Sequence, residues 1–334
     1  MKVGFSDIRI LRKIALLSFP VLLIGAIYLI EDPFKVLYSY SVYYESGKPS
    51  YIPINRDWVS TKMFLLNYPI YKYNSIIFGN SRSIFYEVED WKKYISSNEC
   101  FHFDASGESI YGIYKKVLFL NSNEIKIKNA IIVLDYETLN VVTNSGGRIF
   151  LKHPAVSKDG YLMFQIESLK AFFSSDFLKG YLLFKLYGVV SGSLDSRPFN
   201  YSSVSNEIRF SYYEDMIHRN MTSYYYPRKE MFKRKDTVQQ YFPEVIKKQQ
   251  KEMLEFIGNK LRNDGAVYKI IISPLYDQVG LNHMDLMALH SIFGKSNVFD
   301  FSGKNNITSD MHNYYDGSHY RPHVARLIME KVYF

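Results

Sequence analysis

Residues 75–83 read SIIFGNSRS, a short apolar run that leads directly into a glycine, an asparagine and two serines. Continuous apolar runs of this length are typical of strands buried on both faces of a parallel sheet. A glycine two positions before Ser81 suits a tight turn from strand to helix. There the hydroxyl projects at the carboxyl edge of the sheet, and free N–H groups of the next helix can hold an oxyanion. Gly-Asn-Ser is also ordinary turn chemistry, so this stretch alone predicts a strand and a turn and leaves a catalytic role for Ser81 open.

The rest of the chain alternates strand and helix patterns. Four more apolar runs lie at residues 101–103, 130–134, 268–272 and 297–301. Helical patterns lie at residues 109–121, 243–263, 284–293 and 322–332, with Pro243 expected in the first turn of its helix. This order predicts an α/β fold with a parallel central sheet. Residues from about 140 to 240 fit the alternation poorly, so we interpret them as a large insertion that caps the site.

The N-terminal region carries a long uncharged run, residues 14–30 (IALLSFPVLLIGAIYLI). At 1.5 Å per residue this run reaches about 25 Å, near the short end of what spans a bilayer. The basic residues before it are Lys2, Arg9, Arg12 and Lys13, and the acidic residues after it are Glu31 and Asp32. Such an asymmetry of charge predicts that the N-terminus lies in the cytoplasm.

We therefore predict four segments. Residues 1–13 form a basic cytoplasmic flank, 14–30 a transmembrane signal anchor, 31–72 a spacer and entry segment, and 73–334 an extracytoplasmic domain. A cleaved signal peptide is one alternative, but no small-residue cleavage site follows the apolar run. A buried core helix is a second alternative, which the one-sided basic flank argues against.

The composition excludes several classes of protein. Of the 334 residues, 47% are hydrophobic and 22% are charged, which is ordinary for a globular protein. The lone cysteine, Cys100, allows neither an intramolecular disulfide nor a cysteine-based zinc site. Because no H-E-x-x-H, Walker or G-x-G-x-x-G pattern occurs, we expect no metal and no cofactor. The net charge of +8 comes with no nucleic-acid motif, so we expect no nucleic-acid partner.

A second chemical stretch, YDGSHYRP at residues 315–322, precedes the last predicted helix. Asp316 and His319 are three residues apart and can face the same way. The carboxylate can then accept the imidazole Nδ1–H, which leaves Nε2 free to take a proton from a serine. The structural alternative is an aspartate that caps the last helix, beside a surface histidine.

Together, the strand followed by Gly-Asn-Ser and the D-x-x-H before the last helix resemble the SGNH (GDSL-like) hydrolase superfamily. The ending D-x-x-H-Y-x-P resembles its membrane-anchored envelope branch, which includes relatives of the alginate O-acetylation and D-alanine transfer proteins. The resemblance covers residues of about 73–135 and 267–334 and implies a three-layer SGNH-like fold. It implies that Ser81 is the nucleophile, His319 the base and Asp316 the residue that orients the base. The oxyanion hole would be formed by the N–H groups of Ser81 and Gly107.

The third family block departs from the pattern. The family places an asparagine after the middle strand, where this chain has Leu134-Asp135-Tyr136-Glu137. Asn140 and Asn144 lie nearby but out of register. A hole without that donor would be weaker, since the loss of one donor typically costs about 10²–10³ in rate. Four residues near the two strand ends are candidates for substrate binding, namely Asn80, Arg82, Asp135 and Tyr136.

Two functional hypotheses follow. The first is an extracytoplasmic, serine-dependent acyl ester hydrolase or O-acyltransferase that acts on a cell-envelope or exported polysaccharide. It would be a single-pass protein of the bacterial inner membrane with a periplasmic domain, and its partner would be a membrane protein that donates the acyl group. The alternative is a non-catalytic SGNH-like protein that binds glycan or partner subunits in a polysaccharide modification or export complex. Convergence of Ser81, Asp316 and His319 in a pocket would favour catalysis.

Overall fold

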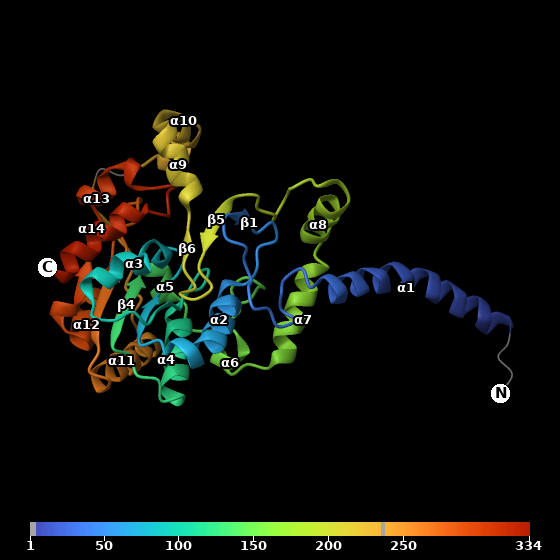
Figure 1. Ribbon diagram of the computed structural model, residues 1–334, viewed down its shortest axis with the longest axis horizontal. Helices are drawn as coiled ribbons and strands as arrows, with labels where there is room; N and C mark the ends of the chain where they lie inside the picture. The colour runs from blue at the N-terminus through green and yellow to red at the C-terminus, as the bar shows by residue number, and fades with distance from the viewer. Residues whose placement is uncertain (1–4, 235–237) are drawn as a thin grey trace.

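A computed structural model describes residues 5–234 and 238–334 (Figure 1). At its centre is a parallel five-stranded sheet in the order β10-β8-β4-β2-β3. The strands are β2 (Ser75–Phe78), β3 (Cys100–His102), β4 (Asn129–Leu134), β8 (Val267–Ile272) and β10 (Val298–Asp300). All five predicted apolar runs therefore form strands, and the predicted α/β class with a parallel central sheet is confirmed.

The strand order creates a switch point between β2 and β4. The chain passes from β2 to β3 on one side, returns to β4 on the other side, and then continues outward to β8 and β10. Loops that leave the carboxyl ends of the two central strands therefore diverge and open a crevice, the usual binding position in open α/β sheets. Ser81 follows β2 and Asp135 follows β4, so both lie at this crevice.

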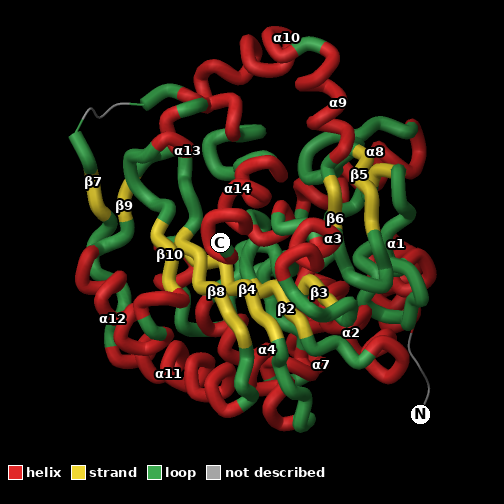
Figure 2. The backbone as a smooth tube through the Cα atoms, turned by 60° about the vertical axis from the view of Figure 1, so that its left-hand side comes forward, coloured by secondary structure: helices red, strands yellow, loops and turns green. Residues whose placement is uncertain are grey.

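Helices cover both faces of the sheet, which gives three layers (Figure 2). On one face lie α2 (Arg56–Tyr71), α4 (Ile110–Ser122), α11 (Lys248–Asn263) and α12 (His283–Phe293), and on the other α3 (Val88–Trp91) and α14 (Pro322–Tyr333). Successive strand residues point to opposite faces, so Ile76 and Ile132 join the first core while Ile77 and Ile131 join the second. Every residue of β2, β3 and β4 is buried, which explains why the central strands appear as continuous apolar runs.

The remaining elements are short or belong to the insertion. Short helices elsewhere are η1 (Ser83–Phe85), η2 (Lys92–Tyr94), α5 (Tyr136–Asn140), η4 (Lys295–Asn297), α13 (Asn306–Ser309) and η5 (Met311–Asn313). The insertion contains α6 (Pro154–Ser157), α7 (Tyr161–Phe172), α8 (Ser175–Tyr187), β5 (Pro198–Tyr201), β6 (Ile208–Arg209), α9 (Ser211–Arg219), α10 (Met221–Tyr225), η3 (Tyr226–Phe232) and β7 (Gln240–Tyr241). β7 pairs with β9 (Val279–Gly280), and β5 pairs with both β6 and β1 (Lys48–Pro49).

Two sequence-based expectations about the fold are wrong. Residues 31–72 are not a spacer, because Phe34, Trp58 and Phe64 are buried in the main core and α2 covers the sheet. Pro243 is not in the first turn of a helix, because α11 begins only at Lys248. The backbone N–H groups of residues 245 and 246 donate instead to the carboxylate of Asp285, which holds this segment against α12.

The N-terminal helix α1 (Phe5–Glu31) extends away from the rest of the molecule (Figure 1). The segment from Arg12 to Glu31 is long and apolar enough to cross a membrane, and its mean hydropathy is 2.2. Only 6% of its most apolar stretch is buried. That exposure contradicts a buried core helix. By length and composition α1 can serve as a membrane anchor or as a signal sequence.

Candidate active site

The structure brings Ser81, His319 and Asp316 together at the crevice, although 235 residues separate the serine from the aspartate in the sequence. Ser81 Oγ lies 2.9 Å from His319 Nε2. His319 Nδ1 lies 3.0 Å from each carboxylate oxygen of Asp316. These contacts form a continuous relay from carboxylate to imidazole to hydroxyl, the geometry that lets a histidine take a proton from a serine.

The turn that presents Ser81 depends on Gly79. This glycine has a φ of +152°, and a Cβ there would lie 2.8 Å from the Cβ of Ser83 and 3.0 Å from the backbone oxygen of Val133. Only glycine fits where the chain leaves β2 so close to Val133 of the neighbouring strand β4. The turn closes through the N–H of Ser83, which donates to the carbonyl of Asn80 at 2.9 Å. The hydroxyl of Ser81 is thereby aimed past the end of β2.

A second turn presents Asp316 and His319. The N–H of Tyr315 donates to the carbonyl of His319 at 2.8 Å, and Asp316 Oδ1 accepts the N–H groups of Ser318 and His319. Asp316 does not cap α14, whose N-cap residue is Arg321. Burial alone would raise the pKa of Asp316, but the hydrogen bond and charge of His319 together with these N–H groups lower it. Asp316 therefore stays ionised and holds the imidazole.

Three of the four predicted substrate-binding residues form hydrogen bonds with one another. Asp135 Oδ2 accepts from Asn80 Nδ2 at 2.7 Å and from Arg82 Nη1 at 2.6 Å, and all three residues are buried. Arg82 Nε also donates to the carbonyl of Ser318 at 3.0 Å, which joins the two turns of the site. Burial opposes the charge of Arg82, yet the nearby Asp135 and Glu137 raise its pKa.

Asp135, Asn80 and Arg82 therefore hold the turns on either side of Ser81, and their contact with a substrate stays a prediction. Tyr136 also faces elsewhere, because its ring stacks on Phe242 with centroids 4.4 Å apart and does not line the main cavity.

The relay opens into a cavity of about 470 Å³. Its aromatic lining comes from Tyr44, Phe85, Phe199, Phe210, Tyr213, Tyr224 and Tyr315, and its charged lining outside the relay from Arg56, Asp104, Asp195, Arg197 and Arg228. Arg56 pairs with Asp104 and Arg197 with Asp195. Arg228 stacks on the Tyr224 ring at 4.0 Å and has no carboxylate partner in the described part of the chain. Sequence spacing gives no signal for these residues, because most come from the insertion and the former spacer.

The insertion also holds the turn of His319 in place. The hydroxyl of Tyr224 donates to the carbonyl of Tyr315 at 3.0 Å. Glu214 accepts two hydrogen bonds from Arg321, at 2.9 and 2.6 Å. Residues of about 195–231 therefore both line the cavity and fix one wall of the relay.

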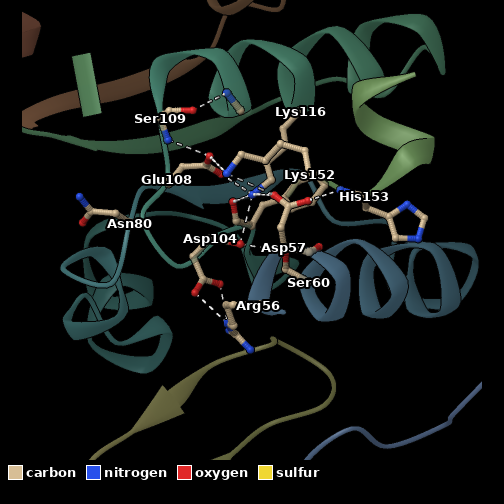
Figure 3. A network of polar contacts seen from close by, with 12 residues as sticks. Arg56, Asp57, Ser60, Asn80, Asp104, Glu108, Ser109, Lys116, Lys152 and His153 are labelled. Carbon is tan, nitrogen blue, oxygen red and sulfur yellow. Dashed lines mark hydrogen bonds and ion pairs between the residues drawn. The ribbon is translucent and has the colours of Figure 1, made fainter. Parts of the chain in front are cut away.

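The loop after β3 rests on a buried network of charges (Figure 3). Its cations are Arg56, Lys116 and Lys152, and its anions are Asp57, Asp104 and Glu108. Lys116 Nζ lies 2.5 Å from Glu108 and 3.0 Å from Asp57, and it also donates to the backbone carbonyls of residues 103 and 104. Burial opposes the charge of Lys116, but the two carboxylates raise its pKa.

This network fixes the loop from which the second oxyanion donor was expected. Gly107 is exposed and does not line the cavity, whereas Ala105 and Ser106 do. The N–H of Ala105 already donates to the carbonyl of Gly79 at 3.2 Å. Among the contacts of the described residues, the N–H groups of Ser81 and Ser106 have no protein acceptor. Ser106, which lines the cavity, is therefore an alternative candidate for the donor expected at Gly107.

Within residues 5–234 and 238–334, no cluster of three or more His, Cys, Asp or Glu residues could hold a metal ion. A scan against protein-family models and a search of curated proteins both leave this chain without a match. The geometry of the site therefore carries the functional argument without support from relatives.

Proposed function

We propose that this protein is an SGNH-like serine acyl ester hydrolase or O-acyltransferase. The observation that carries the proposal is the relay of Ser81, His319 and Asp316, which opens into a cavity at the switch point of the sheet. Hydrogen-bonded nucleophile, base and orienting carboxylate are the arrangement that activates a serine for acyl transfer.

In the proposed reaction, His319 Nε2 takes the proton of Ser81 while Oγ attacks an ester carbonyl. The N–H groups of Ser81 and Ser106 stabilise the oxyanion of the tetrahedral intermediate. The intermediate collapses, and the alcohol leaves with the proton from His319. Water or a sugar hydroxyl then gives its proton to His319 and attacks the acyl-serine, which releases an acid or a new ester and restores Ser81.

An acylated glycan is the proposed substrate. Aromatic rings supply a large, rigid apolar contact area with polar edges, which suits the faces and hydroxyls of sugars. The cavity offers seven such rings beside the relay. Arg228, which lacks a carboxylate partner in the described part of the chain, favours a glycan that carries an acidic group.

The proposed location is the outer side of a cytoplasmic membrane, with α1 as a retained anchor. The basic residues before the apolar run support that orientation. Retention is supported by Tyr28, which is only 2% exposed and whose ring lies 5.0 Å from that of Phe172. Cleavage after the apolar run would uncover this part of the core.

The test is hydrolysis of a chromogenic acetyl ester by the full chain, together with labelling by a fluorophosphonate. Ser81→Ala should abolish both, and His319→Ala should lower both by about 10⁴ or more. Ser318→Ala is the matched control, because this exposed serine is adjacent to His319 and its hydroxyl is outside the relay. Equal rates and equal labelling in all variants would refute the proposal. Added oligosaccharide that becomes acylated would identify a transferase.

The competing proposal is a non-catalytic glycan-binding protein. It is favoured by Asp135, which stands where the resembled family has an oxyanion-hole asparagine and binds Asn80 and Arg82 instead. A binding protein would retain the affinity of the wild type for an acylated oligosaccharide when Ser81 is replaced by alanine, and neither form would be labelled by the fluorophosphonate.

A further inference from the structure

Two helices of the insertion carry apolar stripes that are partly exposed, although Leu178 at one end of the α8 stripe also packs against the core. On α7, Leu162, Ile166, Leu169 and Phe173, the residue just after its end, follow one another at intervals of four, three and four residues. Leu162 is 72% exposed, and Leu169 and Phe173 are also exposed. This spacing places the four side chains on one face of the helix.

The second stripe lies on α8. Leu178, Leu182 and Leu186 follow at intervals of four residues and line a surface hollow of about 390 Å³. Leu186 is 69% exposed and its neighbour Tyr187 is 72% exposed. Apolar side chains gathered in this way on the surface of a soluble domain mark a binding face.

Helices α7 and α8 lie where α1 meets the domain (Figure 1). The ring of Phe172, next to the end of the α7 stripe, contacts Tyr28 in the last turn of α1. Lys185 Nζ, next to Leu186, lies 2.5 Å from the carboxylate of Glu31, the last residue of α1. Each stripe therefore comes within one helical turn of a residue that touches the end of α1.

We infer that these faces of α7 and α8 lie in the surface of the membrane that α1 crosses. The inference rests on the proposed anchoring role of α1. The 20 residues from Arg12 to Glu31 reach about 30 Å, the thickness of the hydrocarbon core, so Glu31 lies at the interface. The stripes beside Glu31 then meet the boundary between headgroups and acyl chains, where apolar faces of interfacial helices bind.

Basic residues support a lipid occupant. Lys179 is exposed on α8 and has no carboxylate partner among the described residues, whereas the exposed Lys170 and Lys185 pair with Glu167 and Glu31. Such side chains place their apolar stems along the acyl chains and their ammonium groups among anionic headgroups. Because α8 continues into the segment that supplies Asp195 and Arg197 to the cavity, this contact would hold the cavity at a fixed height above the bilayer.

The experiment places one environment-sensitive fluorophore at a time on the full chain in vesicles of phosphatidylcholine and phosphatidylglycerol. Leu162→Cys and Leu186→Cys report on the two stripes. Leu22→Cys reports on α1, and Met287→Cys on the exposed surface of α12 is the matched control. Cys100 leaves the labelling selective, because it is 3% exposed and burial raises the pKa of its thiol to about 12.

The labels on both stripes should emit at shorter wavelength than the α12 label and lose roughly half of their intensity to nitroxide-bearing lipids. The α12 label should be unaffected. If the α1 label is quenched and the stripe labels behave like the α12 label, the membrane contact is refuted, and the stripes bind a protein instead. If the α1 label is also unquenched, the anchoring role of α1 is refuted as well. Thermal unfolding of each labelled variant checks that it is folded.

Discussion

Two polar clusters of this molecule, the relay at the crevice and the charged network beneath the β3 loop, use similar residues for different ends. In the relay, the side chains of His319 and Asp316 are 32% and 42% exposed and open into the cavity. In the network, those of Asp57, Glu108 and Lys116 are fully buried, and the two carboxylates share the ammonium group of Lys116. Buried charge alone therefore does not mark an active site. A site also needs a reactive group that a ligand can reach, and Ser81 is one because it lines the cavity.

The largest expected effect falls on the relay. Asp316→Asn should keep the oxygen that accepts the N–H groups of Ser318 and His319 but lose the charge that orients the imidazole. We expect the rate of ester hydrolysis to fall by about 10⁴. Thermal unfolding should change little, because the carboxylate is partly exposed. A variant that loses stability and activity together would show that Asp316 is mainly structural.

The network should respond in the opposite way. Lys116→Met leaves Asp57 and Glu108 buried without their shared cation, so the free energy of unfolding should fall by about 3–5 kcal/mol. Chemical denaturation measures this loss. Lys115→Met, one residue away on α4 but not fully buried, is the matched control and should change stability by less than about 0.5 kcal/mol. Equal losses in the two variants would mean that the network contributes nothing specific.

A pH dependence is expected beside the network, because the backbone N–H of His153 donates to Asp57 at 2.7 Å. Burial, with the nearby charge of Lys62, lowers the pKa of His153 to about 3, and its ring packs on Trp58. In the unfolded chain this imidazole takes up a proton near its ordinary pKa of 6.5. Between these two pKa values the proton binds to the unfolded chain and not to the folded one. The free energy of unfolding is therefore highest above pH 6.5 and decreases as the pH falls toward 3.

Because of His153, the free energy of unfolding at about pH 5 should be about 2 kcal/mol lower than it is above pH 6.5. His153→Asn keeps an acceptor for the N–H of Ala155 and removes the titration. Denaturation at several pH values should show a flatter profile for this variant. Parallel profiles for the wild type and His153→Asn would contradict the assignment.

The smallest effect is expected at Arg82, which connects the two turns of the relay. Lysine in its place can pair with Asp135 but cannot also reach the carbonyl of Ser318 with the same fixed geometry. We expect Arg82→Lys to cost about 1–2 kcal/mol in stability. If Arg82 positions the relay, kcat should fall about tenfold while KM is nearly unchanged. A rise in KM alone would instead return Arg82 to substrate binding.

Much of the fold was predictable because parallel strands buried on both faces must be apolar throughout. The runs at 75–78 and 130–134 show this directly, and the structure places both in the central sheet. Residues 31–72 could not be recognised as part of the domain, because tyrosines and short polar segments carry no clear period. Their burial depends on α2 and on partners far along the chain, such as Phe199 against Tyr44.

The candidate site divides in the same way. The types and local spacing of Ser81, Asp316 and His319 are sufficient to predict a relay, since chemistry restricts which groups can activate a serine. The local sequence could not predict the roles of Asn80, Arg82 and Asp135, because a polar residue beside a nucleophile can face either the substrate or the protein. Only the pairing of β2 with β4 brings Asp135 to both neighbours of Ser81.

The sequence by itself determined the alternation of strands and helices, the apolar N-terminal run and the residues able to form a relay. These features depend on local periodicity and on the chemistry of single side chains. The tertiary structure alone decided which side chains are left free. Burial and pairing are properties of contacts between distant segments: they commit Arg82 and Lys116 to other residues of the chain, gather the cavity lining from the insertion, and leave the outer faces of α7 and α8 exposed beside α1.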